Sequence, residues 1–129
     1  MELIFENYEE LRCLHYALCE AKFHPEPQFR EVQGSPLSAA TADKVYDLLI
    51  ENAPTEREAQ GWRYHRELSP TSPLMPVIEN AARRLAQDKS LSATERKTAL
   101  KVFAAPFHMA DHHIENIFER VGGHRPTLW

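Results

Sequence analysis

The chain has 129 residues, of which 43% are hydrophobic and 26% are charged, and its formal net charge is −4. No segment approaches the roughly 20 apolar residues that a membrane-spanning helix needs. Residues 1–6 lack the basic region and apolar core of a secretory signal. Because the balance is acidic, general nucleic-acid binding is not expected. We therefore expect one globular domain over residues 1–129 that does not enter a membrane.

The charge is divided unevenly along the chain. Residues 1–60 hold 12 acidic and 5 basic side chains, whereas residues 61–129 hold 7 acidic and 10 basic ones. Opposed halves of this kind can neutralise each other in the fold. They can equally leave an acidic face that suits a basic partner.

The two cysteines predict a reducing environment. Cys13 and Cys19 lie six residues apart in one predicted helix, so their Cα atoms are about 9 Å apart, too far for a disulfide. His15 and His24 add ligand chemistry nearby, but Cys13 and Cys19 point about 120° apart around a helix. We therefore expect buried free thiols, a surface histidine and a cytoplasmic location.

Capping residues and apolar spacing predict helices along most of the chain. The Asn7–Glu10 segment has the form of a helix start, and Thr55 with Glu58 has the same form. The predicted helices cover residues 8–22, 38–53, from 55 onward, and 76–88. Residues 29–32 predict a short extended piece, and the sequence leaves open whether residues 62–68 are helix, strand or loop.

The longest helical pattern runs from Ser92 to Val121. Ser92 and Glu95 form a predicted capping box, and apolar residues follow at alternating steps of three and four. Pro106 removes a backbone donor and crowds the carbonyl of Val102. The sequence therefore predicts an all-α fold: a single-domain bundle of four to six helices, with a long C-terminal helix kinked or broken near Pro106.

The first candidate site is one face of the predicted helix over residues 38–53. Acidic residues recur there every four positions, which destabilises an isolated helix, and Tyr46 and Ile50 stand beside them as exposed apolar residues. Carboxylates around an aromatic residue suit an interface with a basic protein. The predicted partner-binding residues are Asp43, Tyr46, Asp47, Ile50 and Glu51. The alternative is a solvated face whose acids pair with basic residues of the second half.

The second candidate site is a metal face on the C-terminal helix. His108, Asp111, His112 and Glu115 would share one side of a continuous helix, where two histidines four residues apart can chelate zinc or another divalent transition metal. The segment lacks the catalytic glutamate of the H-E-x-x-H motif. A solvated polar face with local His–carboxylate pairs is the alternative.

Other patterns add little. Residues 62–66 interleave aromatic and basic side chains, which is compatible with nucleic acid but too short to be specific. Phosphate-binding glycine loops are absent, and the role of Trp129 is left open. We expect a non-enzymatic protein-interaction module without a cofactor, most simply an inhibitor or bacterial immunity protein that neutralises a basic, nuclease-like toxin. A metal-dependent hydrolase is the alternative, and a homodimer stays open.

Overall fold

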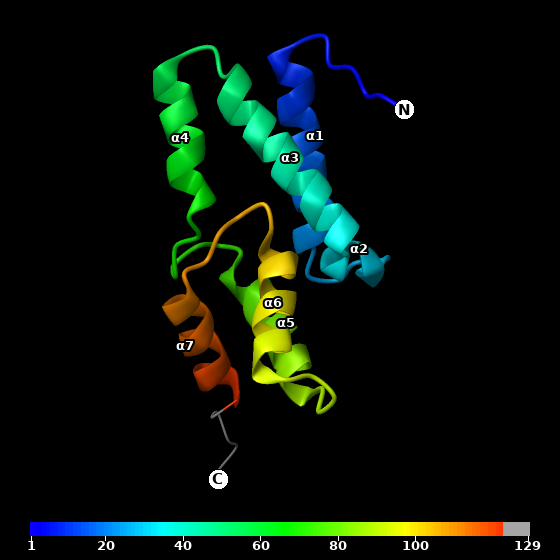
Figure 1. Ribbon diagram of the computed structural model, residues 1–129, viewed down its shortest axis with the longest axis vertical. Coiled ribbons are helices and arrows are strands. Elements are labelled where there is room, and N and C mark those ends of the chain that lie inside the picture. Colours follow the sequence, from blue (N-terminus) through cyan, green and yellow to red (C-terminus); the bar gives the residue numbers. More distant parts are fainter. Residues whose placement is uncertain (123–129) are drawn as a thin grey trace.

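The computed structural model describes residues 1–122 and shows an all-α fold, as predicted (Figure 1). Trp129 lies outside the described residues. Within them there are seven helices, against the four to six expected, and none is long and apolar enough to cross a membrane. The helices are α1 (Tyr8–Phe23), α2 (Arg30–Gly34), α3 (Pro36–Asn52), α4 (Glu56–Arg66), α5 (Met75–Gln87), α6 (Ala93–Ala104) and α7 (Asp111–Gly122).

Side-chain caps fix where three of the predicted helices begin. Asn7, Thr55 and Ser92 each accept a hydrogen bond from the backbone N–H three residues later, at 2.9, 3.1 and 3.1 Å. Glu95 completes the predicted capping box by accepting from the Ser92 N–H at 2.8 Å. These bonds satisfy backbone donors that have no partner within the first turn of a helix.

One local prediction differs from the structure, and one segment that the sequence left open is now assigned. Arg30–Gly34 forms the short helix α2 where an extended piece was expected. The segment left open after Gly61 is helical, because α4 continues to Arg66. Directly after α4, Glu67 forms an isolated β-bridge with His108, and no strand follows within the described residues.

The predicted break at Pro106 is confirmed. Helix α6 ends at Ala104, and the chain turns back before α7 starts at Asp111, so the two helices run in opposite directions (Figure 1). Two hydrogen bonds hold this connection against the end of α4: His108 N–H to the Arg66 carbonyl and Leu68 N–H to the His108 carbonyl, both 2.8 Å.

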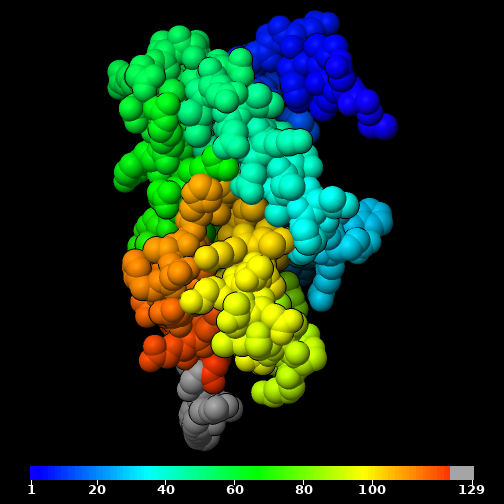
Figure 2. Space-filling model, in the orientation of Figure 1, coloured from blue at the N-terminus to red at the C-terminus, as the bar shows by residue number. Residues whose placement is uncertain are grey.

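The helices form two groups along the length of the molecule. Helices α1, α3 and α4 lie at one end and α5, α6 and α7 at the other, with α2 beside α1, α3 and α6 (Figures 1 and 2). A small apolar cluster around Leu11, Val45 and Leu49 fills the first group. The larger core of the second group includes Ile78, Leu100, Phe103, Ile114 and Ile117. Lys22 and Arg66 link the two groups through hydrogen bonds to the carbonyls of Val102 and Pro106.

Candidate functional site

The predicted partner face of α3 is only partly exposed. Tyr46 is completely buried, so the prediction that its ring faces solvent is wrong. Its hydroxyl donates to the Trp62 carbonyl at 2.5 Å, and burial raises its pKa. Ile50 is half-buried, whereas Glu51 is exposed. Tyr46 lies four residues after buried Ala42 and three before buried Leu49, which places it on the core stripe of α3.

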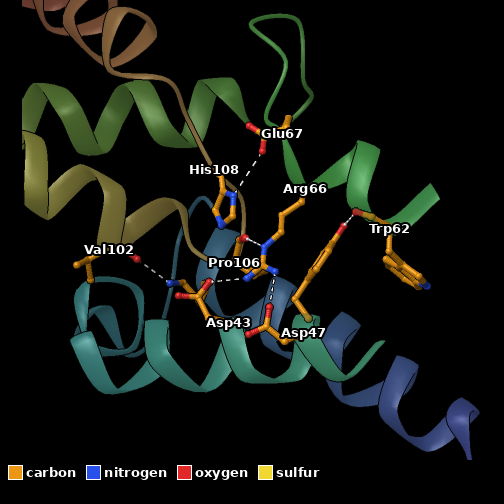
Figure 3. Close-up of polar contacts among 10 residues, drawn as sticks. Asp43, Asp47, Trp62, Arg66, Glu67, Val102, Pro106 and His108 are labelled. Carbon is orange, nitrogen blue, oxygen red and sulfur yellow. Dashed lines mark hydrogen bonds and ion pairs between the residues drawn. The ribbon is translucent and has the colours of Figure 1, made fainter. Parts of the chain in front are cut away.

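Asp43 and Asp47 face a cation from the same chain. The Arg66 guanidinium bonds Asp47 at 2.6 Å and Asp43 at 3.2 Å, and its Nε donates to the Pro106 carbonyl at 3.0 Å (Figure 3). It also lies 4.8 Å from the centre of the Tyr46 ring, within cation–π range. The Arg66 side chain is 11% exposed, whereas those of Asp43 and Asp47 are 45% and 62% exposed, so the arginine is buried but water reaches the two carboxylates. We call this group of five residues the Arg66 junction.

A second cation secures the other side of the same connection. Pro106 has no N–H, so the Val102 carbonyl lacks its usual donor at the end of α6. The Lys22 ammonium supplies one at 2.9 Å, although Lys22 is completely buried (Figure 3). Burial lowers the pKa of Lys22 to about 8, while nearby Asp43 acts in the opposite direction. A cation at this position also complements the dipole of α6.

The third buried polar group is His15, while His24, the other histidine of the predicted cysteine–histidine cluster, is exposed. The His15 ring is 4% exposed and lies against Tyr46 and Trp62, with ring centres 5.3 and 5.4 Å away. Burial lowers its pKa to about 4, so the ring is neutral at pH 7. Cys19 lies 3.7 Å from His15 Nε2, and burial raises the thiol pKa to about 11. Both cysteines are free thiols, but Cys13 is exposed instead of buried.

The residues of the predicted metal face do not share a helical face. His108 lies in the connection before α7, where its Nδ1 is 3.5 Å from Glu67, and Pro106 is the reason that the helix is interrupted. The two carboxylates pair instead with α6: Asp111 with Lys101 at 2.8 Å and Glu115 with Lys97 at 3.0 Å. His112 is exposed. Residues 1–122 contain no group of three or more His, Cys, Asp or Glu side chains that could hold a metal ion.

Carboxylates from three helices gather at the end of the molecule farthest from α7. The start of α1, the end of α3 and the start of α4 all lie there (Figure 1). We call this group the acidic end; its members are Glu6, Glu9, Glu10, Glu51, Glu56 and Glu58. Glu9 pairs with Arg12 and Glu56 with Arg63, both within their own helices. The basic side chains of this region are Arg12, Arg57 and Arg63, so it holds six acidic and three basic residues.

Helix stability explains only part of the acidic end. Glu9, Glu10, Glu56 and Glu58 lie in first helical turns, where negative charge is favourable. The helix dipole does not favour a negative charge at Glu51, because Glu51 lies in the last turn of α3. That turn also contains no basic residue to balance the charge. Leu48, one turn earlier on the same face, is 37% exposed. An apolar side chain among unpaired carboxylates is the composition of an interface surrounded by a polar rim.

Sequence reasoning missed Arg66 and Lys22. A signal for Lys22 was present: it lies eleven residues, about three helical turns, after buried Leu11, and His15 lies between them on the same stripe. Arg66 gave no such signal, because its partners come from residues far away in the chain. Comparisons with protein-family models, curated proteins and solved structures find no match for this chain, so no relative suggests a function.

Proposed function

We propose that this protein is a non-enzymatic binding module of the inhibitor or immunity type, which neutralises a basic protein partner in the bacterial cytoplasm. The observation that carries the proposal is the acidic end, where Glu10, Glu51 and Glu58 from three helices form no ion pair within residues 1–122, while Arg12 and Arg63 pair with Glu9 and Glu56. The Glu10 carboxylate also accepts a hydrogen bond from the Glu6 N–H at 2.8 Å, which leaves its negative charge without a cation. Carboxylates fixed on rigid helices steer a cationic partner and bind it without large rearrangement.

The structure changes which residues we assign to this role. Asp43 and Asp47 bond Arg66 and Tyr46 is buried, so we assign them to the fold. Glu51 remains from the predicted set and is joined by Glu10 and Glu58, with exposed Leu48 as the apolar contact. A nuclease-like partner fits this surface because proteins that bind nucleic acid carry clustered basic side chains.

The test is capture of the partner by the tagged protein from cells of its own source, followed by native mass spectrometry. We expect one basic protein to be retained at low salt and released as salt rises, because the acidic end is exposed to solvent. The variant Glu10→Gln, Glu51→Gln, Glu58→Gln should lose it.

A matched control removes three charges elsewhere. Glu26, Glu31 and Glu119 are exposed and lie away from the acidic end, so changing them to Gln should leave capture intact. Equal loss of partner from both triple variants would mean that only net charge matters, and would contradict a defined binding surface.

A further inference from the structure

A cleft between α2 and the α5–α6 pair combines charged, polar and apolar side chains. Its volume is about 360 Å³, within the roughly 300–1,000 Å³ that small-molecule sites occupy. In Figure 2 the light-blue surface of α2 lies beside the yellow surface of α6. We call it the arginine cleft; the lining residues that determine its chemistry are Arg30, Gln33, Arg84, Leu85, Ala99 and Phe103.

Two arginines give the cleft its positive charge. Arg30 and Arg84 are exposed and form no ion pair within residues 1–122. The cations of α6 are occupied, because Lys97 and Lys101 each pair with a carboxylate and Arg96 donates to two backbone carbonyls. A guanidinium can donate two parallel hydrogen bonds to one carboxylate, so the free arginines favour a ligand that carries a carboxylate.

Asp88 lines the cleft as well, and its charge opposes that of the arginines. Its carboxylate accepts hydrogen bonds from the N–H and the hydroxyl of Ser90 at 3.0 and 2.6 Å, which hold it to its own turn. With two cations and one anion among the lining side chains, a net positive charge remains for a ligand.

A buried hydrogen-bond acceptor adds a second requirement. Gln33 is 3% exposed, and its Nε2 donates to the His24 carbonyl at 2.8 Å, which fixes the orientation of the amide. Gln33 Oε1 accepts no hydrogen bond within residues 1–122. It is not sealed in the core, since the only fully buried side-chain atom there without a partner is His113 Nε2. Gln33 Oε1 therefore opens to the cleft that Gln33 lines, and it favours a ligand with an N–H or O–H donor.

The remaining wall of the cleft is apolar. Leu85 and Ala99 are half-buried, and Phe103 is 4% exposed. An apolar group that covers these side chains gains stability by leaving water. A matching ligand therefore has a carboxylate, a hydrogen-bond donor and an apolar body.

We propose that the arginine cleft binds a small carboxylic acid with an apolar body and an adjacent N–H, the chemistry of an N-acyl derivative of an apolar amino acid. The ligand carboxylate bonds Arg84 and Arg30, its N–H donates to Gln33 Oε1, and its apolar side chain covers Phe103. This site is separate from the acidic end, because it lies on α2, α5 and α6 and selects the opposite charge.

Titration of the isotope-labelled full chain with N-acetyl-leucine, followed by NMR, tests this proposal. The probe has about 12 non-hydrogen atoms, so we expect a dissociation constant in the millimolar range. The signals of Gln33, Arg84 and Ala99 should shift most. The methyl ester of the probe has no charge and should bind about tenfold more weakly or less. N-acetyl-N-methyl-leucine has no N–H and should bind about fivefold more weakly.

Variants of the protein test the same contacts from the other side. Arg84→Gln should weaken binding of N-acetyl-leucine by about tenfold. Arg83→Gln is the matched control, because Arg83 is the neighbouring exposed residue of α5, bonds Asn80 at 2.8 Å and does not line the cleft. Circular dichroism confirms that both variants are folded.

Four results would overturn the proposal. They are the absence of shifts at the cleft, equal binding of the acid and its methyl ester, equal binding of the N-methyl probe, and equal weakening by Arg83→Gln. A peptide that ends in leucine and binds far more tightly than N-acetyl-leucine would assign the cleft to the chain end of another protein instead of a small molecule.

Discussion

Two groups of carboxylates on the same three-helix end of the molecule differ in what they contact. Asp43 and Asp47 lie on the middle of α3, where Arg66 reaches them from the end of α4 and links them to the Pro106 connection. Glu51 lies one helical turn after Asp47, and Glu10 and Glu58 lie at the starts of α1 and α4; these three carboxylates of the acidic end form no ion pair within residues 1–122. The same residue type therefore stabilises the fold in one region and remains available for a partner in the other.

Removal of Arg66 should have the largest effect on stability. Arg66→Ala leaves the Pro106 carbonyl without its donor and leaves two carboxylates without their cation, so we expect a loss of about 3 kcal/mol in the free energy of unfolding. Urea denaturation measures it. Arg63→Ala is the control on the same helix; its side chain is 47% exposed, and its loss should stay within about 0.5 kcal/mol. Similar values for the two variants would contradict the structural role of Arg66.

Lys22 makes stability depend on pH in the alkaline range. Its pKa is about 8 in the folded protein, below the ordinary 10.5, so the unfolded chain holds the proton more tightly between these values. Wild type should therefore gain stability relative to Lys22→Met as pH rises from 8 to 10.5, by up to about 3 kcal/mol. Urea titrations of both proteins across this range measure the difference. A difference that stays constant with pH would show that Lys22 is not buried as a cation.

His15 gives the corresponding dependence in acid. The pKa of His15 falls from 6.5 to about 4 on folding, so between these pH values the unfolded chain binds a proton that the folded protein does not bind. Stability should fall as pH decreases from 6.5 to 4, by up to about 3 kcal/mol, and His15→Leu should remove this part of the loss. Thermal melts at matched ionic strength compare the two. An identical acid dependence of both proteins would rule out His15 as its source.

Neutralising the acidic end should have the smallest effect on stability. Glu10→Gln, Glu51→Gln, Glu58→Gln removes like charges as well as favourable charges in two first turns, so the free energy of unfolding should change by less than about 1 kcal/mol. Urea denaturation of the triple variant and of the wild-type protein measures this difference in the free energy of unfolding. A loss as large as that of Arg66→Ala would assign these carboxylates to the fold and remove them from the proposed interface.

The helices could be predicted from local patterns, and the junction between them could not. Capping by Asn7, Thr55 and Ser92 and the break at Pro106 depend on residues close in sequence, and the structure confirms them. Which face of α3 is buried depends on α1 and α4, so the position of Tyr46 was misjudged.

Two geometric assumptions behind the candidate sites differ from the structure, for related physical reasons. The metal face assumed one continuous helix, whereas the chain turns at Pro106 and separates His108 from Asp111–Glu115. The partner face assumed that charged residues on α3 point into solvent, whereas Arg66, nineteen residues after Asp47, lies against them. Pairing across such distances follows from the packing of helices, which one sequence does not specify. Glu51, in the last turn of α3, was placed correctly at the surface.

The most direct test of this division compares partner capture by two variants under one set of conditions. Asp43→Asn, Asp47→Asn weakens the Arg66 junction, and Glu10→Gln, Glu51→Gln, Glu58→Gln neutralises the acidic end. At a temperature where both are folded, the first should capture the basic partner as wild type does, and the second should not. The reverse result, with the partner lost from the first variant and kept by the second, would contradict the account and return the interface to the middle of α3.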